Sequence, residues 1–270
     1  MEATQGELAA AARSLATARS VGLITGFFVP RGEVAAAETD GPVGTVLLAA
    51  ALGECGMATR IAVDAPCAGV IAEAVSAAGA GTRVDVVTDV PAATAAWRQA
   101  ELDHVISIER CGRSSDGKPR NMRGVDVSPW TVPLDDLFLG GPWRKIGVGD
   151  GGNEIGMGKL PPGLIAQHVP NGAEIACVTA CDHLVVAGVS NWGAYGLMAA
   201  LALLRTDWSS TIAKFLTAER DLSVTLAVVA AGGVDGVTAK REPTVDGFGA
   251  DVHGPLIDRL RLIACGKAAA

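Results

Sequence analysis

The first half of the chain alternates between short, nearly continuous apolar runs and longer stretches whose apolar residues recur at helical spacing. Short apolar runs are typical of parallel strands buried on both faces, and the helical stretches predict the connections between them. The predicted strands cover residues 20–29, 59–63, 82–87 and 104–108, and the predicted helices cover residues 7–18, 43–52, 65–78 and 91–100. This βαβ rhythm predicts an α/β fold of Rossmann-like type, in which a mostly parallel sheet is covered by helices on both faces.

A polar segment over residues 109–142 interrupts this rhythm and shows no clear periodicity. A stretch of this length without predicted structure is usually functional. The rhythm then resumes with predicted strands over residues 145–148, 174–178 and 183–188, and with predicted helices near residues 192–204, 206–219 and 255–265. We therefore expect one continuous α/β domain over residues 1–270, with a helical subregion near residues 192–270.

Charge and composition exclude several classes of partner. The net charge is −7 and no run of Lys or Arg occurs, which argues against a nucleic-acid surface. Residues 184–204 carry no charge, but Ser190, Asn191 and three glycines interrupt them, so we expect no membrane span. Glu2 and Glu7 count against a targeting segment, and the cytoplasm is the expected location. The six cysteines lack the paired spacing of a zinc site, and we expect buried thiols.

The most informative segment is glycine-rich. Residues 146–159 read Ile-Gly-Val-Gly-Asp-Gly-Gly-Asn-Glu-Ile-Gly-Met-Gly-Lys, and five of the ten residues at 149–158 are glycine. Glycine lets the backbone turn sharply and approach a small molecule closely, and it adds almost nothing to a core. The carboxylates of Asp150 and Glu154 and the amide of Asn153 therefore indicate a site of chemistry.

Two known motifs partly match this segment. Residues 147–152 fit the dinucleotide pattern G-x-G-x-x-G, but Asp150 would place a negative charge beside a pyrophosphate. Residues 149–154 also resemble the magnesium-binding loop of haloacid-dehalogenase-type phosphatases, and residues 38–41 echo the nucleophile motif of those enzymes. Glu38 stands where their aspartate nucleophile belongs. A metal-dependent phosphohydrolase is therefore an alternative function.

Four polar segments follow predicted strands, and the carboxyl ends of parallel strands meet at one edge of a sheet. The segments are residues 25–28 with 38–41 beyond them, residues 109–123, residues 149–154 and residues 190–191. We expect them to converge. Arginine binds carboxylates through two hydrogen bonds, so Arg110, Arg113 and Arg123 are candidates for holding a substrate carboxylate.

Taken together, these segments resemble a known family. Thr25-Gly26-Phe27-Phe28, Glu38-Thr39-Asp40-Gly41-Pro42, Ile108-Glu109-Arg110, Asn121-Met122-Arg123-Gly124, the glycine-rich string and Ala187-Gly188-Val189-Ser190-Asn191-Trp192-Gly193 follow one another in the order of the D-glutamate cyclase family. The resemblance is to the C-terminal cyclase domain of its long mitochondrial members, which also occurs as a stand-alone bacterial protein. It covers about residues 20–260 and departs at Cys111, where proline is expected.

The resemblance implies a hydro-lyase that converts D-glutamate to 5-oxo-D-proline with loss of water. In this reaction the α-amine must be neutral to attack, and the γ-carboxyl group needs a proton or a Lewis acid. Asp150 and Glu154 are the expected acid–base pair, with Glu109 and Asp40 in reserve. We expect the amides of Asn153 and Asn191 and the backbone N–H groups of Gly151 and Gly152 to stabilise the oxyanion. The other expected substrate-binding residues are Thr25, Asp40, Asn121 and Ser190.

No cofactor is required by this chemistry. A divalent ion, Mg²⁺ or Mn²⁺, is an open alternative, with Asp40, Asp150 and Glu154 as candidate ligands because hard cations prefer carboxylate oxygens. D-Glutamate is the expected partner, with no nucleic acid and no membrane, and a homodimer is the expected assembly. A non-catalytic protein that binds an acidic amino acid is a further alternative.

Overall fold

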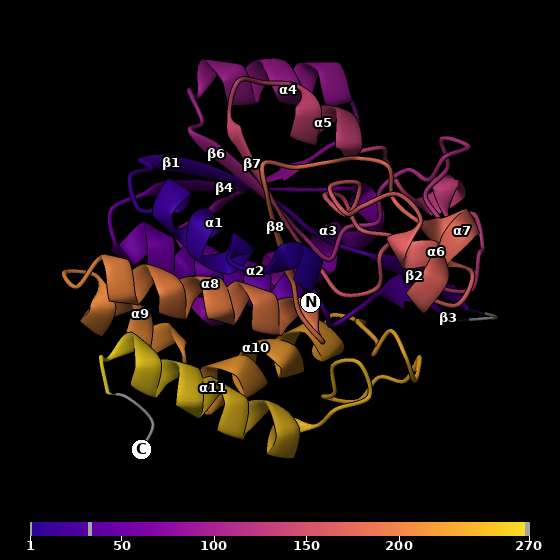
Figure 1. Ribbon diagram of the computed structural model, residues 1–270. Helices are drawn as coiled ribbons and strands as arrows, with labels where there is room; N and C mark the ends of the chain where they lie inside the picture. Colours follow the sequence, from indigo (N-terminus) through magenta and orange to yellow (C-terminus); the bar gives the residue numbers. More distant parts are fainter. Residues whose placement is uncertain (1, 32–33, 268–270) are drawn as a thin grey trace.

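A six-stranded parallel sheet lies at the centre of the protein (Figure 1). The computed structural model describes residues 2–31 and 34–267. The strand order is β5-β4-β1-β6-β7-β8, and every neighbouring pair is parallel. The strands are β1 (Ser20–Ile24), β4 (Ala58–Val63), β5 (Arg83–Val86), β6 (His104–Ile108), β7 (Arg144–Gly149) and β8 (His183–Val186). With helices on both faces, this sheet confirms the predicted α/β, Rossmann-like fold.

The strand order places a reversal in the middle of the sheet. The chain builds outward from β1 through β4 to β5, and it then returns to the other side of β1 to add β6, β7 and β8. Ligands of open α/β sheets bind at the carboxyl ends of the strands where such a reversal occurs. The switch point therefore lies between β1 and β6. The glycine-rich loop follows β7 rather than β1, which is a further difference from dinucleotide-binding folds.

Two layers of helices cover one face of the sheet, and a thinner layer covers the other (Figure 1). The inner helices of the first face are α1 (Glu7–Leu15), α2 (Pro42–Glu54), α3 (Ala65–Ala78) and α8 (Ser190–Leu204), and the outer ones are α9 (Ser209–Phe215), α10 (Ala218–Ala230) and α11 (Ala250–Ala264). The other face carries α4 (Val90–Gln99) and α5 (Asp135–Leu139). Because α2 lies between the sheet and outer helices, it is apolar on all sides and nearly fully buried.

The structure corrects the predicted elements at two places. The strand predicted over residues 20–29 is two strands: β1 ends at Ile24, and β2 (Phe28–Arg31) pairs with β3 (Val34–Ala37) in a separate antiparallel hairpin. Gly26 separates them with φ of 99°, a backbone conformation that a strand residue does not adopt. The strand predicted over residues 174–178 is wrong. The short helix α7 (Gly172–Ile175) occupies part of it, and β8 takes the place beside β7.

Two further differences concern helices. The helix predicted over residues 206–219 is broken between α9 and α10, because the side chain of Thr217 accepts a hydrogen bond from the N–H of Arg220 and starts a new helix. The polar segment 109–142 contains α5 and the 3₁₀ turn η2 (Ser128–Trp130). The remaining short elements are η1 (Glu2–Thr4) and α6 (Leu164–His168). Among the described residues, we find no helix with the length and apolar character needed to cross a membrane.

Candidate functional site

The four polar segments converge at the carboxyl edge of the sheet, as predicted. Glu109 directly follows β6, and Asp150 directly follows β7. Ser190, the first residue of α8, contacts both: its hydroxyl donates to Glu109 Oε2 at 2.6 Å, and its backbone N–H lies 3.1 Å from Asp150 Oδ2. Thr25 follows β1 and is fully buried, and a Cβ atom on Gly41 would lie 2.9 Å from its hydroxyl oxygen.

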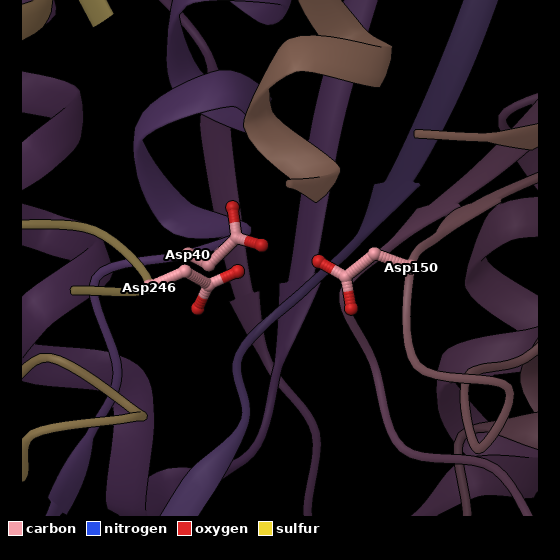
Figure 2. Close-up of side chains that lie close together, drawn as sticks. All are labelled: Asp40, Asp150 and Asp246. Carbon is pink, nitrogen blue, oxygen red and sulfur yellow. The ribbon is translucent and has the colours of Figure 1, made fainter. Parts of the chain in front are cut away.

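Three aspartates form the centre of the site. One carboxylate oxygen from each of Asp40, Asp150 and Asp246 lies within 4.8 Å of the other two. Figure 2 shows Asp40 and Asp246 side by side, with Asp150 approaching from the opposite side. Glu109, Asp150 and Glu154 satisfy the same distance limit, so Asp150 belongs to both groups. Five acidic side chains therefore surround one small volume.

Asp40 is held by backbone N–H groups at the start of two helices. Its Oδ1 accepts from the N–H of Gly41 at 3.0 Å and of Asn191 at 2.8 Å, and its Oδ2 accepts from the N–H of Ser190 at 2.8 Å. The first N–H groups of a helix have no partner within it and favour negative charge. These bonds oppose the effect of burial, which raises the pKa of Asp40.

The glycine-rich loop is folded around Glu154. Glu154 Oε1 accepts from the N–H of Asp150 at 2.8 Å and of Gly151 at 2.6 Å, and Oε2 accepts from the N–H of Gly152 at 2.7 Å. Gly152 has φ of 98°, which favours glycine. Both oxygens of Glu154 and the N–H groups expected to stabilise an oxyanion therefore already have partners within the loop. The acid–base role predicted for Glu154 stays a prediction, and the geometry shows that this residue shapes the loop.

Burial and mutual repulsion raise the pKa of the other acids. Loss of hydration, followed by repulsion from neighbouring carboxylates, raises the pKa of Glu38 and Glu109 well above the ordinary range and raises that of Asp150. The same causes raise the pKa of Asp246 to about 8. In the part of the chain that the structure describes, no lysine or arginine forms an ion pair with these four residues or with Asp40. A cation placed among these acids would relieve the repulsion between them.

Two of the acids also have an unusual backbone. Glu109 and Asp246 adopt positive φ angles of 44° and 53°. Residues other than glycine adopt this left-handed conformation infrequently, and such residues occur often at functional sites. A carboxylate oxygen of each of these two residues lies within 4.8 Å of one of Asp150.

A cavity of about 390 Å³ opens over the cluster. This volume is in the range of small-molecule sites, roughly 300–1,000 Å³. The polar side chains that line it include Glu38, Glu109, Asn121, Arg123, Asp150 and Asp246. Glu38 is only 7% exposed, and its Oε1 has no hydrogen-bond partner in the described residues.

The three arginines predicted to hold a substrate carboxylate lie in different surroundings. Arg110 is fully buried and donates to Asp64 Oδ2 at 2.6 Å and to the carbonyl oxygen of Gly26 at 2.7 Å, so it supports the fold. Arg113 faces away and pairs with Asp136 at 2.5 Å. Arg123 is exposed and lines the cavity, and its guanidinium makes no ion pair with any described residue. Of the three, Arg123 is placed to meet a substrate carboxylate.

The predicted asparagines mainly hold loops. Asn191 Oδ1 accepts from the N–H of Gly44 at 2.7 Å, which joins the start of α2 to the start of α8. Asn153 Nδ2 donates to the carbonyl oxygen of Arg120 at 2.8 Å. Asn121 Oδ1 accepts from two backbone N–H groups of its own loop. Asn121 and Asn153 also line the cavity, whereas Asn191 lies behind Asp40.

Asp246 and Glu38 are site residues that the sequence reasoning missed. Asp246 lies between α10 and α11 and follows no strand of the sheet, so the rule that identified the other segments does not reach it. Glu38 directly follows the β2–β3 hairpin and belongs to the predicted converging segment 38–41, but it was given no role of its own. The signal in the sequence was an acidic residue two positions before Asp40 in the same polar segment.

Comparisons with known proteins identify the family to which this sequence is similar. A family model described as "D-glutamate cyclase-like, C-terminal" matches residues 2–261. A protein from Homo sapiens named "D-glutamate cyclase, mitochondrial" is 38% identical over 218 residues, which are 73% of this chain and 35% of the human protein. The chain thus spans about a third of the length of that relative.

The raised pKa values predict how stability depends on pH. The folded cluster holds protons that the unfolded chain releases near pH 4, so its contribution to stability is full below about pH 4 and is lost as pH rises toward about 8. We expect the free energy of unfolding to fall between about pH 5 and 8 in the wild type, and less steeply in Asp246→Asn. Urea denaturation at several pH values measures both slopes. Asp258→Asn, on the exposed face of α11, is the control and keeps the wild-type slope; equal slopes in all three proteins would contradict the prediction.

Proposed function

The chain belongs to the D-glutamate cyclase-like family, and from this membership we propose that it converts D-glutamate to 5-oxo-D-proline and water. The observation that carries the proposal is the distribution of charge around the cavity. Among the described residues, several acidic groups that line the cavity have no paired cation, and Arg123, which also lines it, has no paired anion. An amino acid offers the matching charges, because its ammonium group meets the acids and its α-carboxylate meets the arginine.

Ring closure moves two protons. The α-ammonium group must lose two of its three protons as the nitrogen attacks the γ-carbon. The departing oxygen must gain two protons to leave as water. No redox partner or net proton is needed. A site for this reaction therefore needs carboxyl groups that can hold a proton near neutral pH. Carboxyl groups with an ordinary pKa are weak bases, and they are already ionised at neutral pH and so cannot serve as acids.

Asp150 and Glu109 fit these two tasks. Asp150 stands between the two acidic groups, and the arrival of an ammonium group beside it lowers its pKa so that it can release its proton and act as base. Glu109 is buried and its pKa is raised, so it can carry a proton that passes to the γ-carboxyl group. Ser190 holds Glu109 in place through its hydroxyl. The cavity also holds the substrate in a folded conformation, and this accelerates the reaction further because the rate of ring closure depends strongly on proximity.

The acid cluster also fits a divalent ion. Asp40, Asp150 and Asp246 offer three hard oxygen ligands within 4.8 Å of one another, and Glu109, Asp150 and Glu154 form a second group that meets the same limit. Mg²⁺ or Mn²⁺ held there would polarise the γ-carboxyl group as a Lewis acid. Glu109 would remain available for proton transfer.

The first test is incubation of the purified protein with D-glutamate and L-glutamate separately, with 5-oxoproline followed by chiral chromatography. We expect product from the D-isomer. Asp150→Asn should lower kcat by at least about 100-fold, the usual contribution of a positioned acid or base. It should not lower thermal stability, because it removes a repelled carboxyl group.

Glu154→Gln is the matched variant four residues away. It should lower the melting temperature, because one oxygen that accepts backbone N–H groups becomes a donor. Absence of product from either isomer, with and without added Mg²⁺ or Mn²⁺, would overturn the proposed function. Wild-type turnover in Asp150→Asn would remove Asp150 from the mechanism.

Arg123→Gln tests the carboxylate clamp. A charge-assisted hydrogen bond contributes about 1.5–3 kcal/mol, so we expect KM for D-glutamate to rise by roughly 10–100-fold with a smaller change in kcat. Arg113→Gln is the control, because Arg113 pairs with Asp136 outside the cavity, and its KM should stay close to that of the wild type. Equal KM values for both variants would place the carboxylate elsewhere.

A metal titration tests the divalent ion. After thorough EDTA treatment, added Mn²⁺ should raise the melting temperature of the wild type and should raise that of Asp246→Asn much less. Turnover of the EDTA-treated protein should increase on the same Mn²⁺ addition. Full turnover after EDTA and no thermal shift with Mn²⁺ would exclude an exchangeable ion at this cluster.

A further inference from the structure

A second, larger cavity lies beside the reaction site. Its volume is about 580 Å³, and its walls are mainly apolar. They include Met157, Leu160, Pro161, Leu164, Ile165 and Val169, most of them from α6 and the turns that flank it. Besides Asp150, its ionisable lining residues are Glu2 and His168, and both are exposed to solvent. The interior of this cavity therefore suits an apolar group.

The two cavities share a wall. Asp150 and Gly151 line both of them, and Gly152 lines the second. A Cβ atom on Gly152 would lie 2.7 Å from Ile165 Cγ2, so the glycine-rich loop packs directly against α6. A γ-carbonyl carbon placed at Asp150 would therefore lie at the border between the two cavities.

The proposed cyclisation of D-glutamate does not account for the second cavity. Water, the second product from D-glutamate, requires no apolar cavity. A free γ-carboxylate is also repelled by the acid cluster and is the least reactive form of an acyl group. A γ-amide is neutral, which removes the repulsion, and its carbonyl carbon is attacked more readily than that of a carboxylate.

We propose that the protein also cyclises γ-D-glutamyl amides whose amine carries an apolar group, and that the second cavity holds this leaving group. The inference rests on the proposed cyclase function, because it uses the same attack of the α-amine on the γ-carbon. The new C–N bond closes the ring, and the bond from the γ-carbon to the substituent nitrogen breaks. Of the two protons that the α-ammonium group loses, one goes to the departing nitrogen and the other goes to solvent or to the released amine.

The substrate class follows from the walls of the second cavity. Aromatic and branched aliphatic amines can bury their surface against Leu164 and Ile165, which favours binding in proportion to the apolar area removed from water. A leaving group that carries a carboxylate, such as an α-amino acid, would place an anion among apolar side chains. We therefore expect γ-D-glutamyl anilides to be better substrates than γ-D-glutamylglycine.

The test compares γ-D-glutamyl-p-nitroanilide with D-glutamate in the same preparation. Release of p-nitroaniline and formation of 5-oxo-D-proline are followed together, with Asp150→Asn as the catalytically impaired control. Leu164→Trp fills the cavity, and Leu164→Asp places a charge in it. Either should lower the ratio of kcat/KM for the anilide to kcat/KM for D-glutamate by about tenfold or more, which is the effect of one or two methylene groups in a hydrophobic pocket.

Leu203→Trp is the matched control, because Leu203 lies on α8 outside both cavities and is 54% exposed. This variant should leave the ratio unchanged. Use of two substitutions at Leu164 keeps the test valid if one of them fails to fold.

The outcomes separate this inference from the proposed function. Turnover of D-glutamate without turnover of the anilide would overturn the inference and leave the proposed function standing. Turnover of the anilide with an unchanged ratio in both Leu164 variants would also overturn it. Turnover of the anilide alone, lost in those variants, would support the inference and overturn D-glutamate as the substrate. Absence of both activities would overturn both.

Discussion

The site depends on the contact between the first turn of α8 and three acids, two of which follow strands of the parallel sheet and one of which, Asp40, follows the β2–β3 hairpin. Ser190 alone contacts Asp40, Asp150 and Glu109, through its backbone N–H and its hydroxyl. Like charges at this spacing repel one another strongly, and a helix start supplies N–H groups and a partial positive charge without adding a lysine or arginine that would neutralise the cluster. The acids are thereby held together while remaining available to a cation.

The parallel sheet could be predicted because its signal is local. Runs such as residues 104–108 and 145–148 are apolar and short, and the helices between them have regular spacing. The errors occurred where local pattern and tertiary context differ. Residues 174–178 are apolar enough for a strand, but β8 already occupies the edge beside β7, and part of the run folds as α7. The β2–β3 hairpin was missed because Gly26 ends β1 within one apolar run.

The location of the site could also be predicted, but the tasks of its residues could not. Asp150 and Glu154 are two acids four residues apart in the same loop, and only the path of the backbone decides that three N–H groups point at Glu154. Arg110 and Arg123 are equivalent in the sequence, yet one is buried against Asp64 and the other faces the cavity. Such differences depend on distances between segments far apart in the chain, which residue patterns do not contain.

The position of Asp246 has a consequence for how the protein folds. Asp40 lies before the second helix of the chain, and Asp246 lies just before the last one. Contacts between residues so far apart in sequence form late, because a long loop must close first. The sheet can therefore assemble before the last acid joins the cluster. Repulsion among the carboxyl groups is then met by strands that are already paired, and the acid cluster is completed together with the core, to which Ile257 and Ala264 of α11 belong.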